Sequence, residues 1–170
     1  LSSKKTTLKN SSYIPSINQF SFSFVVNLML NRWTKRYKLD LIHVQGGPGG
    51  VFLLRKVRLP IIYTAHHLYS QQYKFLRKSI YKTLMESERN GYQYSDYVIA
   101  VSSTTKIDLI ENYKIPPDKI CVIPNGVDLG IFRPISLEKF PNSVLYVGRL
   151  HERKGISYLI KAIGKIKEEI

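Results

Sequence analysis

Val122-Ile123-Pro124-Asn125-Gly126-Val127-Asp128 is a short apolar run that ends in a turn of Pro, Asn and Gly. A second apolar run, Val144-Leu145-Tyr146-Val147, leads into Gly148-Arg149 and then into Lys154-Gly155 and an apolar helical pattern. A strand that ends in a glycine turn and feeds a helix is typical of phosphate-binding loops, because backbone N–H groups and cations meet the anion there. The stretch therefore predicts strand–loop–helix units and a phosphate-binding loop.

Short apolar runs and helical patterns alternate along the rest of the chain. Apolar residues recur at three- and four-residue spacing in residues 69–84, 104–113 and 156–166. The predicted strands are residues 41–45, 60–65, 97–101, 119–123 and 144–147. Near-continuous apolar strands separated by helices are typical of parallel sheets covered on both faces and joined by right-handed crossovers. We therefore predict an α/β fold with a Rossmann-like, doubly wound parallel sheet.

The chain is predicted to contain one domain and the beginning of another. Residues 133–142 hold two prolines and no periodicity, which is typical of a linker. We predict an N-terminal domain over residues 1–134, a linker over 135–142 and the first strand and helix of a truncated second Rossmann-like domain over 143–170. Residues 1–19 are polar and without pattern, so we expect disorder there; a start at Leu1 suggests an internal starting point.

Composition limits the class of protein and of partner. The 170 residues are 44% apolar and 12% aromatic, which is enough for one buried core. A net charge of +14 favours polyanionic partners such as nucleic acid, an acidic membrane surface or phosphorylated substrates, although solubility alone also accounts for it. Cys121 lies in an apolar run and is predicted to be a buried, inert thiol. Residues 20–30 are too short and polar to span a bilayer, and we expect a cytosolic amphipathic helix there.

Loops at the carboxyl ends of the predicted strands form the candidate site, since ligands of open α/β sheets bind at that edge. The loop at residues 46–50 could contact an anion or simply form a tight turn with close packing. His66 and His67 follow the strand at 60–65; adjacent side chains diverge, so the pair is a poor metal chelate and no metal site is predicted. The residues expected to line the cleft are Gly49, Gly50, Ser102, Asn125 and Gly126.

Two further polar groups have simpler explanations than catalysis. Ser102-Ser103 lacks the surroundings of a nucleophile, and we expect a helix N-cap there. Glu88 lies beside Glu86 and Arg89, so a solvated or cap-pairing role is favoured over that of a base. Arg149 and Lys154 suit a diphosphate, because Arg offers a bidentate fork and Lys a point charge; two solvated cations are the alternative.

Five segments resemble those of one known family, in order and spacing, from about residue 38 to the end. They are Asp40-Leu41-Ile42-His43-Val44, Thr64-Ala65-His66, Ala100-Val101-Ser102, residues 122–128 with Phe132 and Pro134, and Val147-Gly148-Arg149-Leu150 with Lys154-Gly155. Together they resemble glycosyltransferase family 4. The resemblance implies the GT-B fold, in which two Rossmann-like domains face each other across a cleft, and transfer with retention of anomeric configuration.

The resemblance also implies roles for individual residues. It gives Arg149 and Lys154, with Gly148, the donor diphosphate, and it gives His66 a catalytic position beside the transferred sugar. The family's opening strand with its Gly-rich loop, and the glutamate pair of its second domain, have no counterpart in this sequence. We therefore expect a fragment cut at both ends and inactive by itself.

The function expected from these residues is part of a retaining glycosyltransferase. It would move a hexose from a nucleotide-sugar to a saccharide or lipid-linked acceptor, without a metal or cofactor, in the cytoplasm or peripherally at the inner face of the cell membrane. A basic nucleic-acid-binding module is an alternative that lacks a recognisable motif, and a non-catalytic nucleotide-sugar-binding homologue is another.

Overall fold

The computed structural model describes residues 17–46, 52–54, 56–77, 79–134, 141–150 and 154–169. The chain divides into two compact units, Leu1–Val127 and Asp128–Ile170, and each is described by itself. The predicted linker at 135–142 lies mostly outside the described residues and stays a prediction. The predicted disordered segment also lies mostly outside them, but residues 17–19 belong to a helix.

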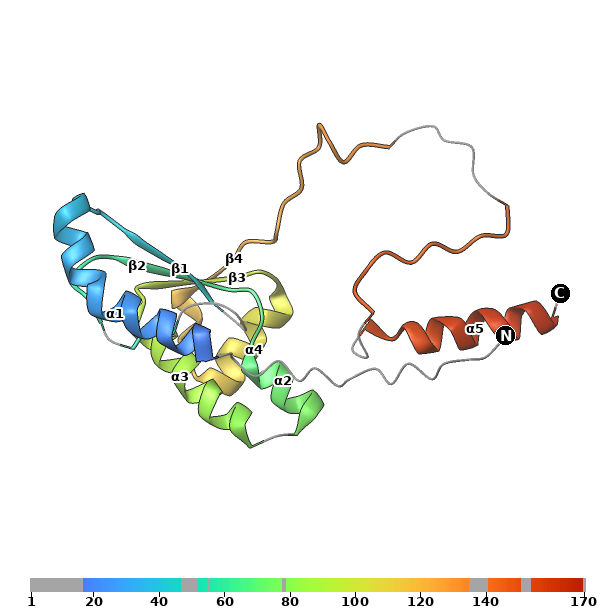
Figure 1. The fold of residues 1–170 in the computed structure, drawn as a ribbon, viewed down its shortest axis with the longest axis horizontal. Helices are drawn as coiled ribbons and strands as arrows, with labels where there is room; N and C mark the ends of the chain where they lie inside the picture. Colours follow the sequence, from blue (N-terminus) through green and yellow to red (C-terminus); the bar gives the residue numbers. More distant parts are fainter. Residues whose placement is uncertain are drawn as a thin grey trace. The chain divides into compact units, whose positions relative to one another are not determined.

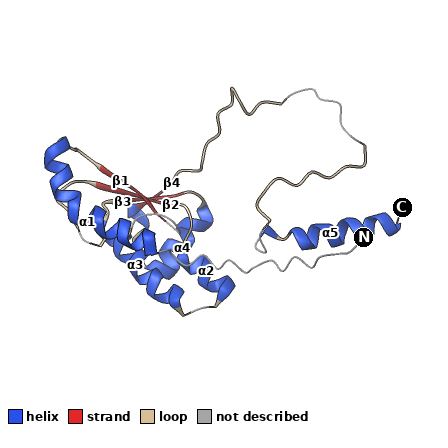
Figure 2. Ribbon diagram, viewed as in Figure 1, coloured by secondary structure: helices blue, strands red, loops and turns tan. Residues whose placement is uncertain are grey.

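The first unit is built on a four-stranded parallel sheet in the order β1-β2-β3-β4 (Figures 1 and 2). This arrangement confirms the predicted α/β class and four of the five predicted strands. The elements of the unit are α1 (Ile17–Tyr37), β1 (Ile42–Gly46), β2 (Ile61–Ala65), α2 (Tyr69–Leu76), α3 (Ile80–Tyr94), β3 (Tyr97–Ala100), α4 (Ser103–Tyr113), η1 (Pro117–Lys119) and β4 (Ile120–Val122).

The core lies on one face of the sheet. Alternate strand residues such as Val44, Tyr63 and Val98 are buried together with Leu30 of α1 and Leu109 of α4. Strands that follow one another in sheet order, joined by right-handed crossovers, place every crossover on the same side. Figure 1 accordingly shows α2, α3 and α4 below the sheet. On the other face of the sheet, His43 and Gln45 of β1 and Cys121 of β4 are exposed.

The exposed face corrects the prediction for Cys121. This residue was expected to be buried because its neighbours are apolar, but its side chain is exposed on β4. Burial along β1 alternates in the same way, with His43 and Gln45 exposed between buried neighbours. An apolar run indicates a strand, but it does not indicate which of its two faces is covered.

Helix α1 carries polar side chains on its buried face. Asn27 donates from Nδ2 to the carbonyl of Phe52 (2.8 Å) and accepts from the Leu54 N–H at Oδ1 (2.9 Å), while Ser23 Oγ accepts from the Phe52 N–H (3.1 Å). These bonds satisfy a segment that belongs to no helix or strand, so the polar residues have to face inward. The predicted helix is confirmed, but its exposed side is the apolar one. None of the helices that the structure describes has the length and hydropathy needed to cross a bilayer.

Gly46 explains part of the glycine-rich stretch that follows β1. A Cβ atom at Gly46 would lie 2.0 Å from Cε1 of Tyr63, and one at Gly91 would lie 2.9 Å from Cε2 of the same ring. Tyr63 is 1% exposed, so its ring occupies the space between the two glycines. Close packing, the second of the two explanations for this stretch, therefore holds for Gly46, whereas residues 47–50 lie outside the described part.

Replacing Gly46 by Ala is expected to destabilise the first unit by about 2 kcal/mol, since the methyl group has to displace a buried aromatic ring. Urea denaturation of the chain measures this. Gly126→Ala is the matched control, because nothing lies within 4 Å of the added Cβ and a change within about 0.5 kcal/mol is expected. Equal stability of the two variants would contradict the packing role of Gly46.

In the second unit, the predicted helix forms but the predicted strand does not. Helix α5 spans Ile156–Glu169 and follows Gly155, whose φ of 65° is left-handed. Residues 144–147 are not a strand, and Leu145 and Val147 are 87% and 86% exposed. The prediction of a strand there is wrong for this structure, because a strand needs a neighbouring strand to accept its hydrogen bonds and no described residue of this unit supplies one.

Candidate functional site

The carboxyl ends of β1 to β4 lie at one edge of the sheet because all pairings are parallel. His66 directly follows β2, and Ser102 lies two residues beyond β3. Asn125 and Gly126 follow β4 and are exposed. These four predicted residues therefore come from loops at the same edge. Gly49 and Gly50 lie outside the described residues.

A chain of polar side chains connects His66 to the edge strand. Nε2 of His66 lies 2.7 Å from Oε1 of Gln45, and Nε2 of Gln45 lies 3.1 Å from Nε2 of His43. His43 in turn lies 2.7 Å from the hydroxyl of Thr64. Because an amide oxygen only accepts, His66 donates from Nε2. In the neutral form of the ring, this bond leaves Nδ1 as the acceptor.

Ser102 has the structural role expected of it. Its Oγ accepts from the Thr105 N–H (3.1 Å), and its extended backbone precedes α4. The N-cap prediction is thereby confirmed. The side chain is half-buried, so a place in the cleft lining stays a prediction.

Glu88 has a larger role than its sequence context suggested. It is 1% exposed, so the solvated alternative is wrong. Oε2 accepts from the Tyr69 N–H (2.9 Å) at the start of α2 and also from the Tyr113 hydroxyl. The Tyr113 hydroxyl accepts in turn from the Ser70 N–H (3.0 Å). The cap-pairing role is therefore confirmed, and it extends across three helices. A signal was present in the sequence, since Glu88 continues the buried stripe of Tyr81 and Leu84 on α3.

Burial changes the ionisation of this carboxyl group. Removal from water raises the pKa of Glu88 from 4.5 to about 7, and the hydrogen bonds from Tyr113 and from the Tyr69 N–H offset part of that rise. The groups around it are a buried tyrosine of β2, two further tyrosines and the carboxylate of α4. They are Tyr63, Tyr92, Tyr113 and Asp108. Glu88 therefore titrates near neutral pH inside the core.

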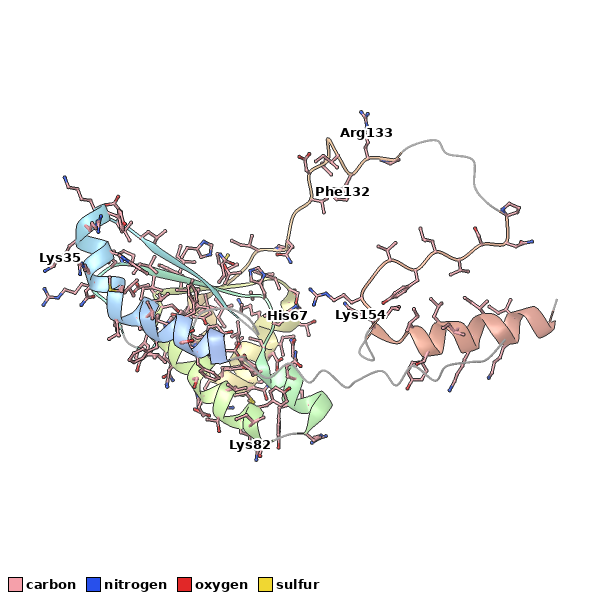
Figure 3. All side chains as sticks on the ribbon, viewed as in Figure 1. Lys35, His67, Lys82, Phe132, Arg133 and Lys154 are labelled. Atoms are coloured by element: carbon pink, nitrogen blue, oxygen red, sulfur yellow. The ribbon has the colours of Figure 1, made fainter. Side chains whose placement is uncertain are left out.

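The predicted diphosphate-binding residues belong to the second unit. Lys154 lies two residues before α5, and its side chain is exposed (Figure 3). Arg149 is exposed as well, and its carbonyl accepts from the Tyr146 hydroxyl (3.0 Å). A Cβ at Gly148 would lie 2.8 Å from that same hydroxyl, so the glycine permits this turn. A cation at the N-terminus of a 14-residue helix is suited to an anionic ligand.

A parallel four-stranded sheet with loops gathered at its carboxyl edge defines a Rossmann-like class of domain, as in the N-terminal domain of GT-B enzymes. Comparison of the sequence with known families gives a match over residues 5–130 to Glycosyltransferase Family 4. The chain belongs to this family.

The chain is also similar to individual glycosyltransferases whose names differ. Alpha-monoglucosyldiacylglycerol synthase of Streptococcus pneumoniae is 26% identical over 79% of this chain and 35% of its own length. D-inositol 3-phosphate glycosyltransferase of Corynebacterium glutamicum is 30% identical over 79% of this chain and 37% of its own. MMP alpha-(1->4)-mannosyltransferase of Mycolicibacterium hassiacum is 22% identical over 79% and 36%. The chain thus spans little more than a third of the length of these relatives.

Proposed function

We propose that this chain is part of a retaining glycosyltransferase that moves a hexose from a nucleotide-sugar to a saccharide or lipid-linked acceptor. The observation that carries the proposal is the Gly148-Arg149 turn and Lys154 in front of α5, in a member of a glycosyltransferase family. The chain alone, at about a third of its relatives' length, is expected to be inactive.

The proposed chemistry needs positive charge more than a protein nucleophile. Cleavage of a sugar–nucleotide bond leaves negative charge on the diphosphate. Arg149 and Lys154, the second of which lies two residues before α5, would stabilise that charge, so transfer is proposed to need neither a metal nor another cofactor. The acceptor would attack from the face that the diphosphate leaves, which retains the anomeric configuration.

His66 is proposed to contact the transferred sugar. Its Nε2 is engaged by Gln45, so Nδ1 is the nitrogen available to accept from a sugar hydroxyl. His66→Ala in the intact protein is expected to lower kcat about 100-fold. His67→Ala is the control, because this neighbour is exposed and diverges from His66 along the chain. Equal losses in the two variants, measured as transfer of radiolabelled sugar, would contradict the assignment of His66.

An anionic membrane surface is proposed as a partner, on the evidence of α1. The outward side of this helix exposes Phe22 (59%), Phe24 (58%) and Leu28 (61%) in its first half. Its second half bears the exposed cations Arg32, Lys35 and Arg36, and Lys35 projects from that end in Figure 3. Aromatic and aliphatic side chains that enter the acyl boundary, next to cations that meet anionic headgroups, are typical of helices that lie in the membrane interface.

Phe24→Gln with Leu28→Gln is expected to weaken binding of the chain to vesicles of phosphatidylglycerol and phosphatidylcholine at least 10-fold, because each apolar side chain contributes about 1.5–3 kcal/mol when buried. Sedimentation with vesicles measures this at low and high salt. Ile107→Gln is the control, as this residue is also exposed (53%) but lies on α4. Binding that depends neither on the lipid charge nor on these two residues would exclude α1 as a membrane surface.

A further inference from the structure

We propose that Glu88 is a positioning residue, which fixes the loop that carries His66 by capping the first turn of α2 from within the core. The inference rests on the proposed function, because its kinetic effect is observed through sugar transfer. It adds a residue that contacts neither the proposed donor nor the acceptor.

Helix α2 lacks a local cap. Its N-cap residue is Leu68, which is extended and offers no side-chain hydrogen bond. The Leu68 carbonyl accepts from Gln71 and Gln72, but the N–H groups of Tyr69 and Ser70 need other acceptors. Glu88 serves the first directly and the second through the Tyr113 hydroxyl. The first turn of α2 is therefore anchored by side chains of α3 and α4.

The Ser70 side chain strengthens this anchor. Its Oγ donates to Oδ2 of Asp108 on α4 (3.0 Å), and Oδ1 of Asp108 pairs with Lys74 one turn further along α2 (3.1 Å). Ser70 and Tyr69 are 1% and 0% exposed. Glu88, Tyr113, Ser70 and Asp108 are buried, and the hydrogen bonds of such a core network favour one arrangement of the turn.

The anchor is close to His66 in the chain. Ala65 is held in β2, where it pairs with Ala100, and only three residues separate it from Tyr69. A three-residue loop with both ends fixed has little conformational freedom. If the cap is lost, the end of the loop at Tyr69 is released. His66 is then no longer held at 2.7 Å from Oε1 of Gln45. The His66 ring would then sample several positions at the edge of the sheet.

If the side chain at position 88 only filled space in the core, it would not have to be a carboxylate. A buried carboxylate is costly unless it is hydrogen-bonded, and an apolar side chain of similar size is often as stable or more so. In its ionised form this carboxyl group places a negative charge at the positive end of α2, where it complements the helix dipole. A glutamate at position 88 is therefore better explained by a role in fixing the loop geometry than by a contribution to core stability alone.

Kinetic measurements on the intact protein test the proposal. Glu88→Leu is expected to lower kcat at least about 10-fold with the donor KM within about 2-fold, because chemistry and not ground-state binding depends on the position of His66. Glu88→Gln should restore kcat to within about 3-fold of wild type, since its amide oxygen can accept from the Tyr69 N–H. Glu86→Leu and Glu86→Gln are matched controls on the exposed side of α3, expected to leave kcat unchanged. A kcat for Glu88→Leu equal to that of wild type would overturn the proposal.

Two readouts do not depend on transfer. The Tyr69 and Ser70 amides should exchange with solvent at least about 10-fold faster in Glu88→Leu, relative to the Tyr63 amide of β2, and should regain protection in Glu88→Gln. Tyr113→Phe, which keeps Glu88, should expose the Ser70 amide alone. The His66 ring resonances, identified by their loss in His66→Gln, should shift in Glu88→Leu. If the wild-type protein transfers no sugar, the proposed function fails, and the amide exchange rates and His66 resonances test the role of Glu88 by themselves. Unchanged exchange or unchanged His66 resonances in Glu88→Leu would overturn that role.

Discussion

Arg149→Ala and Lys154→Ala are each expected to lower kcat for sugar transfer by the intact protein by about 10²–10³-fold, the usual loss when one preorganised group that stabilises developing negative charge is removed. Lys154 lies two residues before α5, so the field of the helix dipole adds to that of its charge. The charge on the departing diphosphate develops only during the reaction, so the loss should fall on kcat more than on the donor KM.

The control for this prediction is Lys161→Ala. Lys161 is an exposed cation on α5, and its substitution removes the same charge from the same unit. It lies more than a turn beyond the start of the helix. Its removal is expected to change kcat by less than about 2-fold, since exposed charges at that distance are largely screened. If Arg149→Ala and Lys154→Ala turn over as fast as Lys161→Ala, the two residues do not bind the donor diphosphate.

The free energy of unfolding of the chain is expected to fall by about 3 kcal/mol, through Glu88, as the pH rises from 4.5 to 7. The pKa of this carboxyl group is about 7 in the folded state and 4.5 in its ordinary state, and one pKa unit corresponds to about 1.4 kcal/mol. Between these values the folded state holds a proton that the unfolded state has lost. The contribution is therefore greatest below pH 4.5, declines with rising pH and levels off above pH 7.

Other groups titrate over the same range, so the measured quantity is the difference between wild type and Glu88→Gln. Urea denaturation at several pH values should give a difference that declines by about 3 kcal/mol over this window. Glu86→Gln is the matched control, because Glu86 lies on the same helix and its side chain is mostly exposed (67%). A difference for Glu88→Gln that does not vary with pH would show that Glu88 is not buried as described.

The parallel sheet could be predicted from the sequence, because its strands are short apolar runs separated by segments of helical periodicity. It was less informative about where one helix ends. The stripe over residues 69–84 continues through Leu76 and Ile80, yet α2 ends at Leu76 and is followed by Arg77, whose φ of 54° is left-handed. Arg is not a residue that ordinarily marks such a turn, so the break depends on tertiary packing and leaves no composition signal.

The candidate site was predictable in outline but not in its contacts. His66 could be located from its place after a strand, whereas its partner Gln45 could not, because register sets which side chains meet across β1 and β2. Residues 144–147 illustrate a related limit. Their apolar pattern favours a strand, but a strand forms only beside another, and intrinsic preference does not supply the neighbour.

The most direct test of the central claim is transfer by the intact protein. Nucleoside diphosphate esters of glucose and of mannose, radiolabelled in the sugar, would be supplied with diacylglycerol and inositol phosphate acceptors, and the linkage of the product read by proton NMR. The expected result is a glycosylated product in which the sugar keeps the anomeric configuration of the donor. A folded protein that transfers sugar from none of these donors, or a product of inverted configuration, would contradict it.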